Sequence, residues 1–383
     1  QRWIKPLPKQ LINKFAAGEV VERPASVLKE LVDNSIDSGA TRIEIEIEKS
    51  GIQLIKIVDN GCGIPEDQIE IAFARHATSK ISSFDELEQL LSYGFRGEAL
   101  PSIASVSRLL MVSRPADQDV GTEIIFEGGV LLSKKPIAAA PGTVIEVADL
   151  FYNTPARRKF LKAESTESRH ISRYAMALAM GRSDIGFSLK LNNRNVFNCG
   201  PNESLDSRVS AVLSSARGKM IRVEGEAGPV KVIGLVGKPE TAQQNRFSQF
   251  IYINNRYIGS PTLSHAIAAG FGELLPRGRQ PIAVVHLNVD PKEVDVNAHP
   301  AKTEVRLSNE RDIHDALFRI VRDSLKSDGL IPSFLSAKRP TSQASPSQAT
   351  DRLFQRDNDR IIPGIQSRQD NPNFLAEIYR SVP

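Results

Sequence analysis

Apolar and polar residues follow two different rhythms near the start of the chain. Residues 26–37, SVLKELVDNSID, carry apolar side chains at three- and four-residue spacing, which predicts an amphipathic helix. Arg23-Pro24 separates it from an earlier predicted helix, and Gly39 is a suitable C-terminal cap. The segments TRIEIEIE and LIKIVD then predict two strands. Because only the short turn KSGIQ joins them, these strands must be antiparallel.

The same patterns continue up to a predicted domain boundary near residue 205. Helices are predicted over residues 66–92, with a polar break at HATSK, after YGFRGEAL, and over residues 156–182. Strands are predicted at SRLLMVSR, GTEIIFEGG and GTVIEVADLF. The segment FSLKLNNRNVFNC predicts a hairpin that turns at Asn192-Asn193.

Residues 206–330 form a second predicted region. Its helices are RVSAVLSSA, residues 261–275 and RDIHDALFRIVRDSLKS, and its strands are PVKVIGLVG, QFIYINNRYIG and PIAVVHLNV. The order mixes helices and strands without regular alternation, so the fold class is α+β. From residue 331 the chain is rich in Ser, Pro and Gln, which predicts a largely disordered linker over residues 331–383.

Composition sets limits on the class of protein. A chain of 383 residues with 40% hydrophobic residues suggests two domains with real cores plus additional sequence. The two cysteines, Cys62 and Cys199, are far apart, which argues against a disulfide framework and for a reducing, intracellular compartment. No apolar run is long enough to span a membrane. The net charge of +4 suits a polyanionic partner or an ordinary solvated surface.

The polar face of the helix over residues 26–37 is the first candidate site. At about 100° per residue, Glu30, Asn34 and Asp37 fall within an arc of about 60°. No lysine or arginine is expected on that arc, and a face of oxygen acceptors suits a metal ion or a water molecule to be activated. The alternative is an ordinary amphipathic surface helix. Asp33, about 60° from Glu30, is expected to be a surface residue.

The segment VDNGCGI, residues 58–64, is the second candidate. Asp59 ends a predicted strand, and Gly61 and Gly63 permit a turn too tight for a side chain. The strand belongs to an antiparallel hairpin, so the dinucleotide-binding pattern of a βαβ unit does not apply, and no Walker A motif is present. A carboxylate at a strand end can accept a hydrogen bond from an exocyclic amine such as that of adenine. A plain Asp-Asn-Gly turn is the alternative.

Further segments could contact phosphates. YGFRGEAL, residues 93–100, places exposed amides just before a helix, which is a ready anion site, and HATSK adds two hydroxyls and an ammonium. Lys302, in VDVNAHPAKTEVR, could reach a γ-phosphate from the second region. Each segment also has an ordinary interpretation as a helix-capping loop or an exposed lysine, and Gly142-Thr143 is uninformative alone.

Together these segments resemble the nucleotide motifs of the GHKL ATPases: E-x-x-x-N at Glu30 and Asn34, DNGCGI, GFRGEAL and GTVI. The longer strings FAAGEVVERPASVLKELVDNSIDSGAT, ARHATSK, FYNTPARRKFL and VDVNAHPAKTEV resemble the MutL family of DNA mismatch repair proteins in particular. The resemblance covers about residues 4–330. It implies a Bergerat-type (GHKL) α/β sandwich ATPase domain over residues 1–205. A ribosomal-protein S5-like transducer domain, with part of the DNA-binding surface, would follow over residues 206–330.

The resemblance also implies roles for single residues, with ATP and Mg²⁺ as cofactors. Glu30 would be the general base that deprotonates the attacking water, and Asn34 would coordinate Mg²⁺. Asp59 would contact the adenine amine, and Lys302 would touch the γ-phosphate as a second catalytic residue. The other implied ATP contacts are Asp37, Gly63 and Thr143, the lid residues Thr78, Ser79 and Lys80, and the phosphate loop Gly94, Phe95, Arg96, Gly97 and Glu98.

The family further implies a nucleotide switch, in which ATP orders the lid and an N-terminal arm, two copies dimerise, and slow hydrolysis releases them. DNA of any sequence would bind through its phosphates. The candidate DNA contacts are Arg256, Arg277 and Arg279, and Arg157, Arg158 and Lys159 form another basic cluster.

Other implied partners are a mismatch sensor of the MutS type and a downstream endonuclease or helicase. The expected location is the cytoplasm or nucleoid of a bacterium or a eukaryotic nucleus, away from membranes. The sequence contains no recognisable nuclease motif, so no nuclease activity is expected. Two competing interpretations are another GHKL ATPase, of the gyrase B or chaperone type, and a DNA-binding scaffold with a vestigial nucleotide site.

Overall fold

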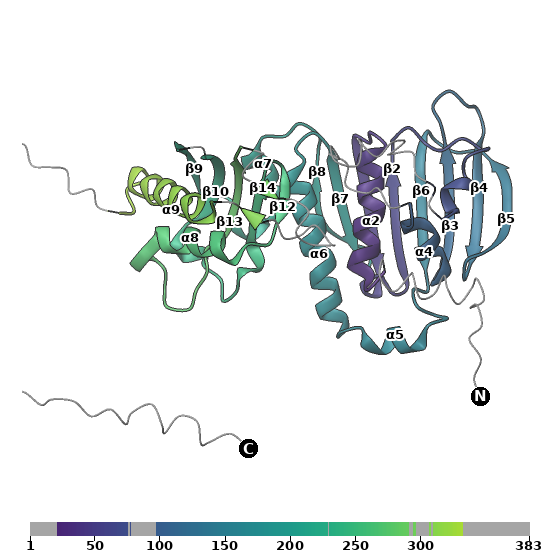
Figure 1. Ribbon diagram of the computed structural model, residues 1–383, viewed down its shortest axis with the longest axis horizontal. Coiled ribbons are helices and arrows are strands. Elements are labelled where there is room, and N and C mark those ends of the chain that lie inside the picture. Colours follow the sequence, from purple (N-terminus) through teal and green to yellow (C-terminus); the bar gives the residue numbers. More distant parts are fainter. Residues whose placement is uncertain are drawn as a thin grey trace, which may run out of the picture. The chain divides into compact units, whose positions relative to one another are not determined.

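The structure is a computed structural model that describes residues 21–75, 77, 97–228, 230–290, 294–295, 306–307 and 309–331. These residues belong to one compact unit, residues 1–333, built around two main β-sheets (Figure 1). The helix predicted before Arg23 and nearly all of the linker predicted over residues 331–383 lie outside the described residues. No helix in the described part of the chain is long and apolar enough to cross a membrane.

The first sheet has eight strands in the order β5-β4-β3-β6-β2-β1-β7-β8. The pair β1 and β7 is parallel, and the other neighbours are antiparallel. The strands are β1 (Arg42–Glu48), β2 (Leu54–Asp59), β3 (Arg108–Arg114), β4 (Gly121–Glu127), β5 (Val130–Ile137), β6 (Gly142–Ala148), β7 (Gly186–Leu191) and β8 (Arg194–Cys199). The predicted antiparallel pairing of the first two strands is confirmed, with Ile43 opposite Asp59.

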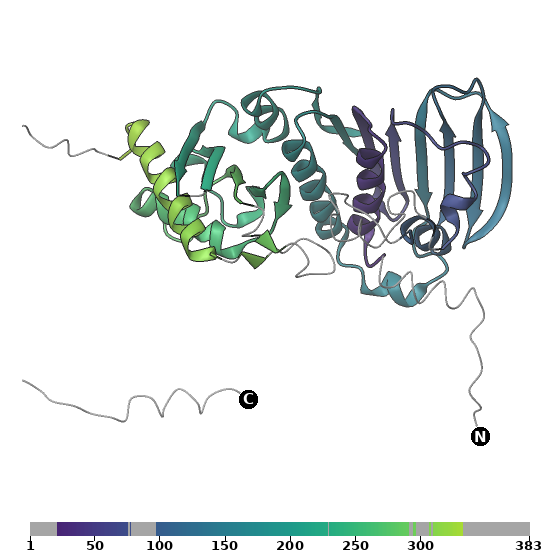
Figure 2. The ribbon, with the colours of Figure 1, turned by 45° about the horizontal axis from the view of Figure 1, so that its top comes forward.

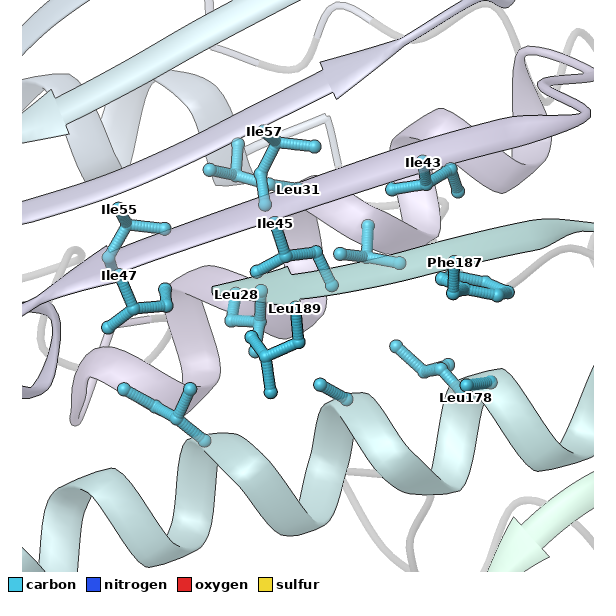
Figure 3. Packing of buried hydrophobic residues seen from close by; sticks show 14 of the residues in the cluster. Leu28, Leu31, Ile43, Ile45, Ile47, Ile55, Ile57, Leu178, Phe187 and Leu189 are labelled. Carbon is cyan, nitrogen blue, oxygen red and sulfur yellow. The ribbon is translucent and has the colours of Figure 1, made fainter. Parts of the chain in front are cut away.

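Helices α2 (Pro24–Asp37), α4 (Ala99–Ser105) and α6 (Glu164–Gly181) pack against this sheet, and the short α5 (Pro155–Phe160) precedes α6. The alternation of β1 explains the packing, because its three isoleucines are buried while the glutamates between them stay partly exposed. Figure 3 shows apolar side chains of β1, β2, β7, α2 and α6 meeting in one layer. Full burial of one such side chain contributes about 1.5–3 kcal/mol. This layer therefore fixes α2 on the sheet.

The helix that carries the first candidate site begins and ends where the sequence predicts. Pro24 stands in its first turn, where no backbone N–H is required. At the other end Gly39 has φ +76°, and its N–H bonds to the carbonyl of Ile36 at 3.0 Å. The N–H of Ala40 bonds to the carbonyl of Ser35 at 3.2 Å. These two bonds form a Schellman cap, which turns the chain from α2 into β1.

The structure differs from the sequence prediction at three places in this region. Residues 66–75 form turns and a 3₁₀ helix, Ile71–Phe73, rather than the start of an α-helix. The helix predicted over 156–182 is interrupted after α5, where the buried Glu167 side chain accepts a hydrogen bond from the N–H of Lys162 at 3.1 Å. Strand β5 was not predicted, because its apolar residues do not alternate and several stay exposed at the sheet edge.

The predicted hairpin at Asn192-Asn193 has the expected backbone, and a second pair of asparagines turns in the same way. Asn192 and Asn193 adopt φ values of 46° and 62° between β7 and β8. Asn254 and Asn255 adopt 48° and 65° between β11 (Gln249–Ile253) and β12 (Arg256–Ile258). Two consecutive positive φ values define the type I′ turn, which matches the twist of the flanking strands.

The second sheet has five strands in the order β12-β11-β13-β10-β9, with β11 and β13 parallel. Its strands are β9 (Met220–Ala227), β10 (Val230–Gly237), β11 (Gln249–Ile253), β12 (Arg256–Ile258) and β13 (Ala283–Asn288). Strand β9 was not predicted, and a small separate ladder pairs β14 (Val294–Asp295) with β15 (Arg306–Leu307). Helices α8 (Pro261–Phe271) and α9 (Glu310–Ser327) pack together beside this sheet, and α9 lies against β9 (Figure 2).

Helix α6 also contacts the second sheet. The hydroxyl of Tyr252 donates to the carbonyl of Ala177 at 2.6 Å, and its ring stacks on His286 with 4.4 Å between ring centroids. The guanidinium of Arg173 donates to the hydroxyl of Tyr257 at 3.0 Å. The two hydrogen bonds tie the middle of α6 to strands β11 and β12.

A fully buried arginine fixes the segment that follows the first sheet. Arg208 lies on α7 (Leu205–Val212) and is 0% exposed. Its guanidinium donates to the carbonyls of Ala179, Arg182 and Ser183 at 2.6, 2.9 and 3.1 Å and also to that of Gly200. Several carbonyl dipoles thus compensate the cost of burying this charge.

Candidate functional site

Asp59 lies at the end of β2, directly beside α2. Its carboxylate accepts hydrogen bonds from the hydroxyl of Ser35 on α2 at 2.7 Å and from the N–H of Gly61 at 2.9 Å. Burial raises the pKa of the Asp59 carboxyl, while its hydrogen bonds from Gly61, Ser35 and the backbone of Thr143 act in the opposite direction. The structure thus places a fixed hydrogen-bond acceptor in a sheltered position, at the residue where the sequence predicts the strand to end.

The loop after Asp59 is held in place by the turn between α2 and β1. The side-chain oxygen of Asn60 accepts from the N–H groups of Thr41 and Arg42 at 2.9 and 2.8 Å. The N–H of Cys62 donates to the carbonyl of Ser38 at 3.0 Å. These bonds give the Asp-Asn-Gly segment a defined position next to the C-terminal end of α2, beyond what a free turn would have.

A side chain on any of three glycines of this site would clash with neighbouring atoms. A Cβ on Gly61 would lie 1.9 Å from the hydroxyl of Ser38, and one on Gly63, whose φ is +71°, would lie 2.4 Å from the carbonyl oxygen of Arg114. A Cβ on Gly142, whose φ is +115°, would lie 2.1 Å from the carbonyl oxygen of Asp59. The glycines therefore bring the ends of β2, β3 and β6 together.

Thr143 is buried beside Asp59 in the register of β2 and β6. Its hydroxyl lies 2.8 Å from the hydroxyl of Ser113 on β3, and Ser113 accepts from the N–H of Ile64 at 2.8 Å. Sequence reasoning missed Ser35 and Ser113. Ser35 could have been found, because it lies on the sheet-facing side of the helix between two buried apolar positions. Ser113 shows no local signal, since only the pairing of three strands brings it here.

Glu30, Asn34 and Asp37 lie on the outer side of α2 as predicted, with Glu30 and Asn34 partly buried and Asp37 exposed. Lys29 lies outside this arc on the helix, but its ammonium reaches the edge of the arc. The ammonium of Lys29 lies 3.4 Å from a carboxylate oxygen of Glu30 and 2.9 Å from one of Asp33. Burial lowers the pKa of Lys29, but the charges of Asp33 and Glu30 raise it further, so the group remains a cation.

Asp33 is 1% exposed, so the prediction of a surface residue is wrong. Its carboxylate pairs with Lys29 and accepts a hydrogen bond from the hydroxyl of Tyr174 on α6 at 3.4 Å. Asp33 does lie on the predicted side of α2, but α6 covers that side. Local periodicity cannot show a contact with a helix so distant in the sequence. Burial raises the pKa of Asp33, and the Lys29 ammonium opposes this shift.

The predicted phosphate loop is described only in part. Gly97 has φ +59°, a Cβ there would lie 2.5 Å from the carbonyl oxygen of Ala77, and Glu98 precedes α4. The predicted helix after YGFRGEAL is thus confirmed. The other predicted contacts of this kind lie outside the described residues: Thr78, Ser79, Lys80, Gly94, Phe95, Arg96 and Lys302.

The predicted DNA contacts are partly or fully exposed in the structure. Arg277 and Arg279 are exposed in the loop before β13, and Arg256 is partly exposed on β12. In the second basic cluster, Arg158 and Lys159 are exposed on α5, whereas burial lowers the pKa of the half-buried Arg157.

Two families match the two halves of this architecture. Residues 22–127 match the family of histidine kinase-, DNA gyrase B-, and HSP90-like ATPases, and residues 210–326 match the DNA mismatch repair protein, C-terminal domain family. The chain is 45% identical over 324 residues to the DNA mismatch repair proteins MutL of Xanthomonas oryzae pv. oryzae (strain PXO99A) and Xylella fastidiosa (strain M12). In both comparisons 84% of this chain is aligned with 52% of the relative.

Solved structures show the same arrangement. The ATPase domain of the Aquifex aeolicus mismatch repair endonuclease MutL is 27% identical, with a TM-score of 0.59, and the match covers 79% of this chain and 99% of that one. The Aquifex aeolicus MutL ATPase domain complexed with ADP is 29% identical, with a TM-score of 0.53 over 71% of this chain and 94% of that one. The N-terminal domain of a DNA repair protein, at 24% identity and a TM-score of 0.70, shares the fold.

The eight-stranded sheet with α2, Asp59 and the glycine turns therefore defines a GHKL-type ATPase fold followed by a second α/β domain. The chain belongs to the MutL family of DNA mismatch repair proteins. It spans about half the length of the curated relatives that it matches. The competing interpretation of a gyrase B-type subunit or a chaperone is set aside.

Proposed function

We propose that this chain binds ATP with Mg²⁺ and slowly hydrolyses it to ADP and phosphate beside α2. The observation that carries the proposal is the sheltered carboxylate of Asp59, held by Ser35 at 2.7 Å on the same helix as Glu30 and Asn34. A fixed acceptor of this kind suits the exocyclic amine of adenine, while the outer side of α2 offers oxygen ligands to the phosphate end. The similarity to a MutL ATPase domain complexed with ADP supports the same assignment.

The donor set near Asn34 fits Mg²⁺. This ion prefers oxygen ligands and usually takes one or two from the protein, with the rest from phosphates and water. The described residues contain no group of three His, Cys, Asp or Glu that could hold a metal ion alone. An ion that arrives with the nucleotide needs no such group, and the Asn34 amide oxygen would be its protein ligand. When bound, Mg²⁺ supplies charge neutralisation at the phosphate oxygens.

Glu30 is the general base of the proposed reaction. Its carboxylate takes a proton from a water molecule as the water oxygen bonds to the γ-phosphorus. The bond from that phosphorus to the bridging oxygen breaks, and ADP leaves. Thr78, Ser79 and Lys80, the loop from Gly94 to Glu98, and Lys302 complete the proposed phosphate contacts.

The wider role follows from the family. We propose that nucleotide binding joins two copies of the chain through their N-terminal domains, and that the dimer binds DNA and links mismatch recognition to downstream repair enzymes. Residues 1–205 would be the ATPase domain, residues 206–330 the transducer domain, and residues 331–383 the linker. Since phosphates provide the DNA contacts, binding would weaken steeply as salt rises.

Replacement of Glu30 by Ala tests the catalytic proposal. We expect ATP affinity within a few-fold of the parental value, a dimer trapped by ATP, and turnover lowered by about 10²-fold or more. The measurements are phosphate release, fluorescent-nucleotide binding and sizing by light scattering. Glu44→Ala, which removes a partly exposed carboxylate of β1 paired with Arg42, is the control and should turn over normally.

Two outcomes would refute the proposal. Hydrolysis by Glu30→Ala at the parental rate would exclude Glu30 as the base. Failure of the parental chain to bind ATP with Mg²⁺ would instead favour a DNA-binding scaffold with a vestigial site.

A further inference from the structure

We propose that Lys29 is a positioning residue for Glu30, held in place by the buried carboxylate of Asp33. The inference rests on the proposed function, because it assumes that Glu30 is the general base. It gives a role to Lys29, which the sequence analysis did not consider, and to Asp33, which it expected at the surface.

The contact between Lys29 and Glu30 is unusual for a helix. Side chains one residue apart do not normally face each other, whereas side chains four residues apart do. Lys29 and Asp33 have the favourable spacing, and their ion pair is short, at 2.9 Å. This pairing bends the lysine along the helix, so that its ammonium also comes within 3.4 Å of Glu30 Oε1. Asp33 thus determines where the cation stands.

Asp33 is suited to this task because it is rigid. It is 1% exposed and lies between α2 and α6, where the Tyr174 hydroxyl donates to its Oδ1 at 3.4 Å. The Lys29 ammonium donates to its Oδ2, so the two carboxylate oxygens have different partners, one from each helix. A buried carboxylate with partners on both sides holds its neighbour in one geometry far better than a solvated one.

The arrangement has a direct chemical consequence at Glu30. The ammonium occupies the side of Oε1, which leaves Oε2 as the oxygen that accepts a proton from water. Orientation of such a group within hydrogen-bond reach of the attacking water is what general-base catalysis depends on.

The first test is Lys29→Met, which keeps the aliphatic stem and removes the charge. We expect kcat to fall about tenfold or more, the range of a charge-assisted hydrogen bond, while the KM for ATP changes less than about threefold. Lys29→Arg, which restores the charge, should recover most of the activity. Lys56→Met is the matched control. It breaks a 2.7 Å ion pair between Lys56 on β2 and Glu146 on β6, and it should leave kcat unchanged.

A second variant separates positioning from folding. Lys29→Met alone leaves Asp33 buried without its cation, which is itself destabilising. In the double variant Lys29→Met/Asp33→Asn no uncompensated charge remains, so thermal stability should return toward the parental value while kcat stays low. Recovery of kcat together with stability would overturn the inference, because it would show a purely structural role.

Failure of this inference is distinguishable from failure of the proposed function. If Glu30→Ala abolishes turnover but Lys29→Met turns over at the parental rate, Glu30 is the base and Lys29 does not position it. If Glu30→Ala itself retains activity, the proposed function fails first.

Discussion

Acidification should destabilise the protein through one histidine of the second sheet. His286 lies on β13 and stacks on Tyr252 beneath α6. Burial lowers the pKa of His286 to about 4 from an ordinary value of 6.5, while a hydrogen bond with the backbone of Met180 opposes the shift. Its Nε2 is buried and has no hydrogen-bond partner among the described residues, so a proton added there would remain unsatisfied. Folding therefore favours the neutral ring.

The sign and size of the effect follow from proton linkage. Between pH 6.5 and about 4 the unfolded chain binds a proton at this position and the folded chain does not, so the free energy of unfolding falls as the pH falls through this window. Well above pH 6.5 the His286 ring is neutral in both the folded and the unfolded chain, so the free energy of unfolding does not change there. With a pKa of 6.5 in the unfolded chain and about 4 in the folded chain, the free energy of unfolding falls by about 2 kcal/mol between pH 7.5 and pH 5.

His286→Phe keeps a ring for stacking and removes the titration. Urea denaturation followed by circular dichroism at pH 7.5 and pH 5 should show a smaller loss in the variant, by about 2 kcal/mol. Asp33 and Asp59 have raised pKa values and act in the opposite direction with pH, so the difference between variant and parent is the informative quantity. His265→Gln, at an exposed position, is the control. An equal loss in His286→Phe and in the parent would refute the reasoning.

Three further results are expected. Gly142→Ala should destabilise the first domain by about 3 kcal/mol or more and weaken ATP binding, because its Cβ would lie 2.1 Å from the carbonyl oxygen of Asp59. Thermal melting measures the loss, and Gly39→Ala, at a position with positive φ but open space, is the control that separates the clash from the backbone strain. Arg208→Met should lower stability by about 3–5 kcal/mol because several carbonyls lose their donor, and an unchanged urea midpoint would contradict this. Arg277→Ala/Arg279→Ala should weaken DNA binding and reduce its salt dependence by about two in the logarithmic slope, measured by fluorescence anisotropy; an unchanged slope would remove these residues from the interface.

Sequence patterns predicted the parts of the fold that depend on neighbours in the chain. The alternating isoleucines of β1, the glycine cap of α2 and the paired asparagines between β7 and β8 all act within a few residues, and the structure confirms them. Strand β5 was missed because an edge strand lacks the burial that produces alternation.

At the candidate site the same limit applies. Local spacing predicted that Glu30 and Asn34 share one side of α2 and that Asp59 ends a strand. It could not predict that α6, more than a hundred residues later in the chain, covers Asp33 and brings Tyr174 to it. Nor could it predict the Ser113 hydroxyl beside Thr143, which exists only because β3 pairs with β6.

Two adjacent residues of α6 face different partners. Tyr174 donates to Asp33 on α2, while Arg173 donates to the hydroxyl of Tyr257 and the carbonyl of Gln249 in the second sheet. A displacement of α6 would therefore strain both sets of bonds at once. Coupling between two binding sites is reciprocal. If a partner binds the second sheet, shifts α6 and thereby changes the affinity for nucleotide, then nucleotide changes the affinity for that partner by the same factor.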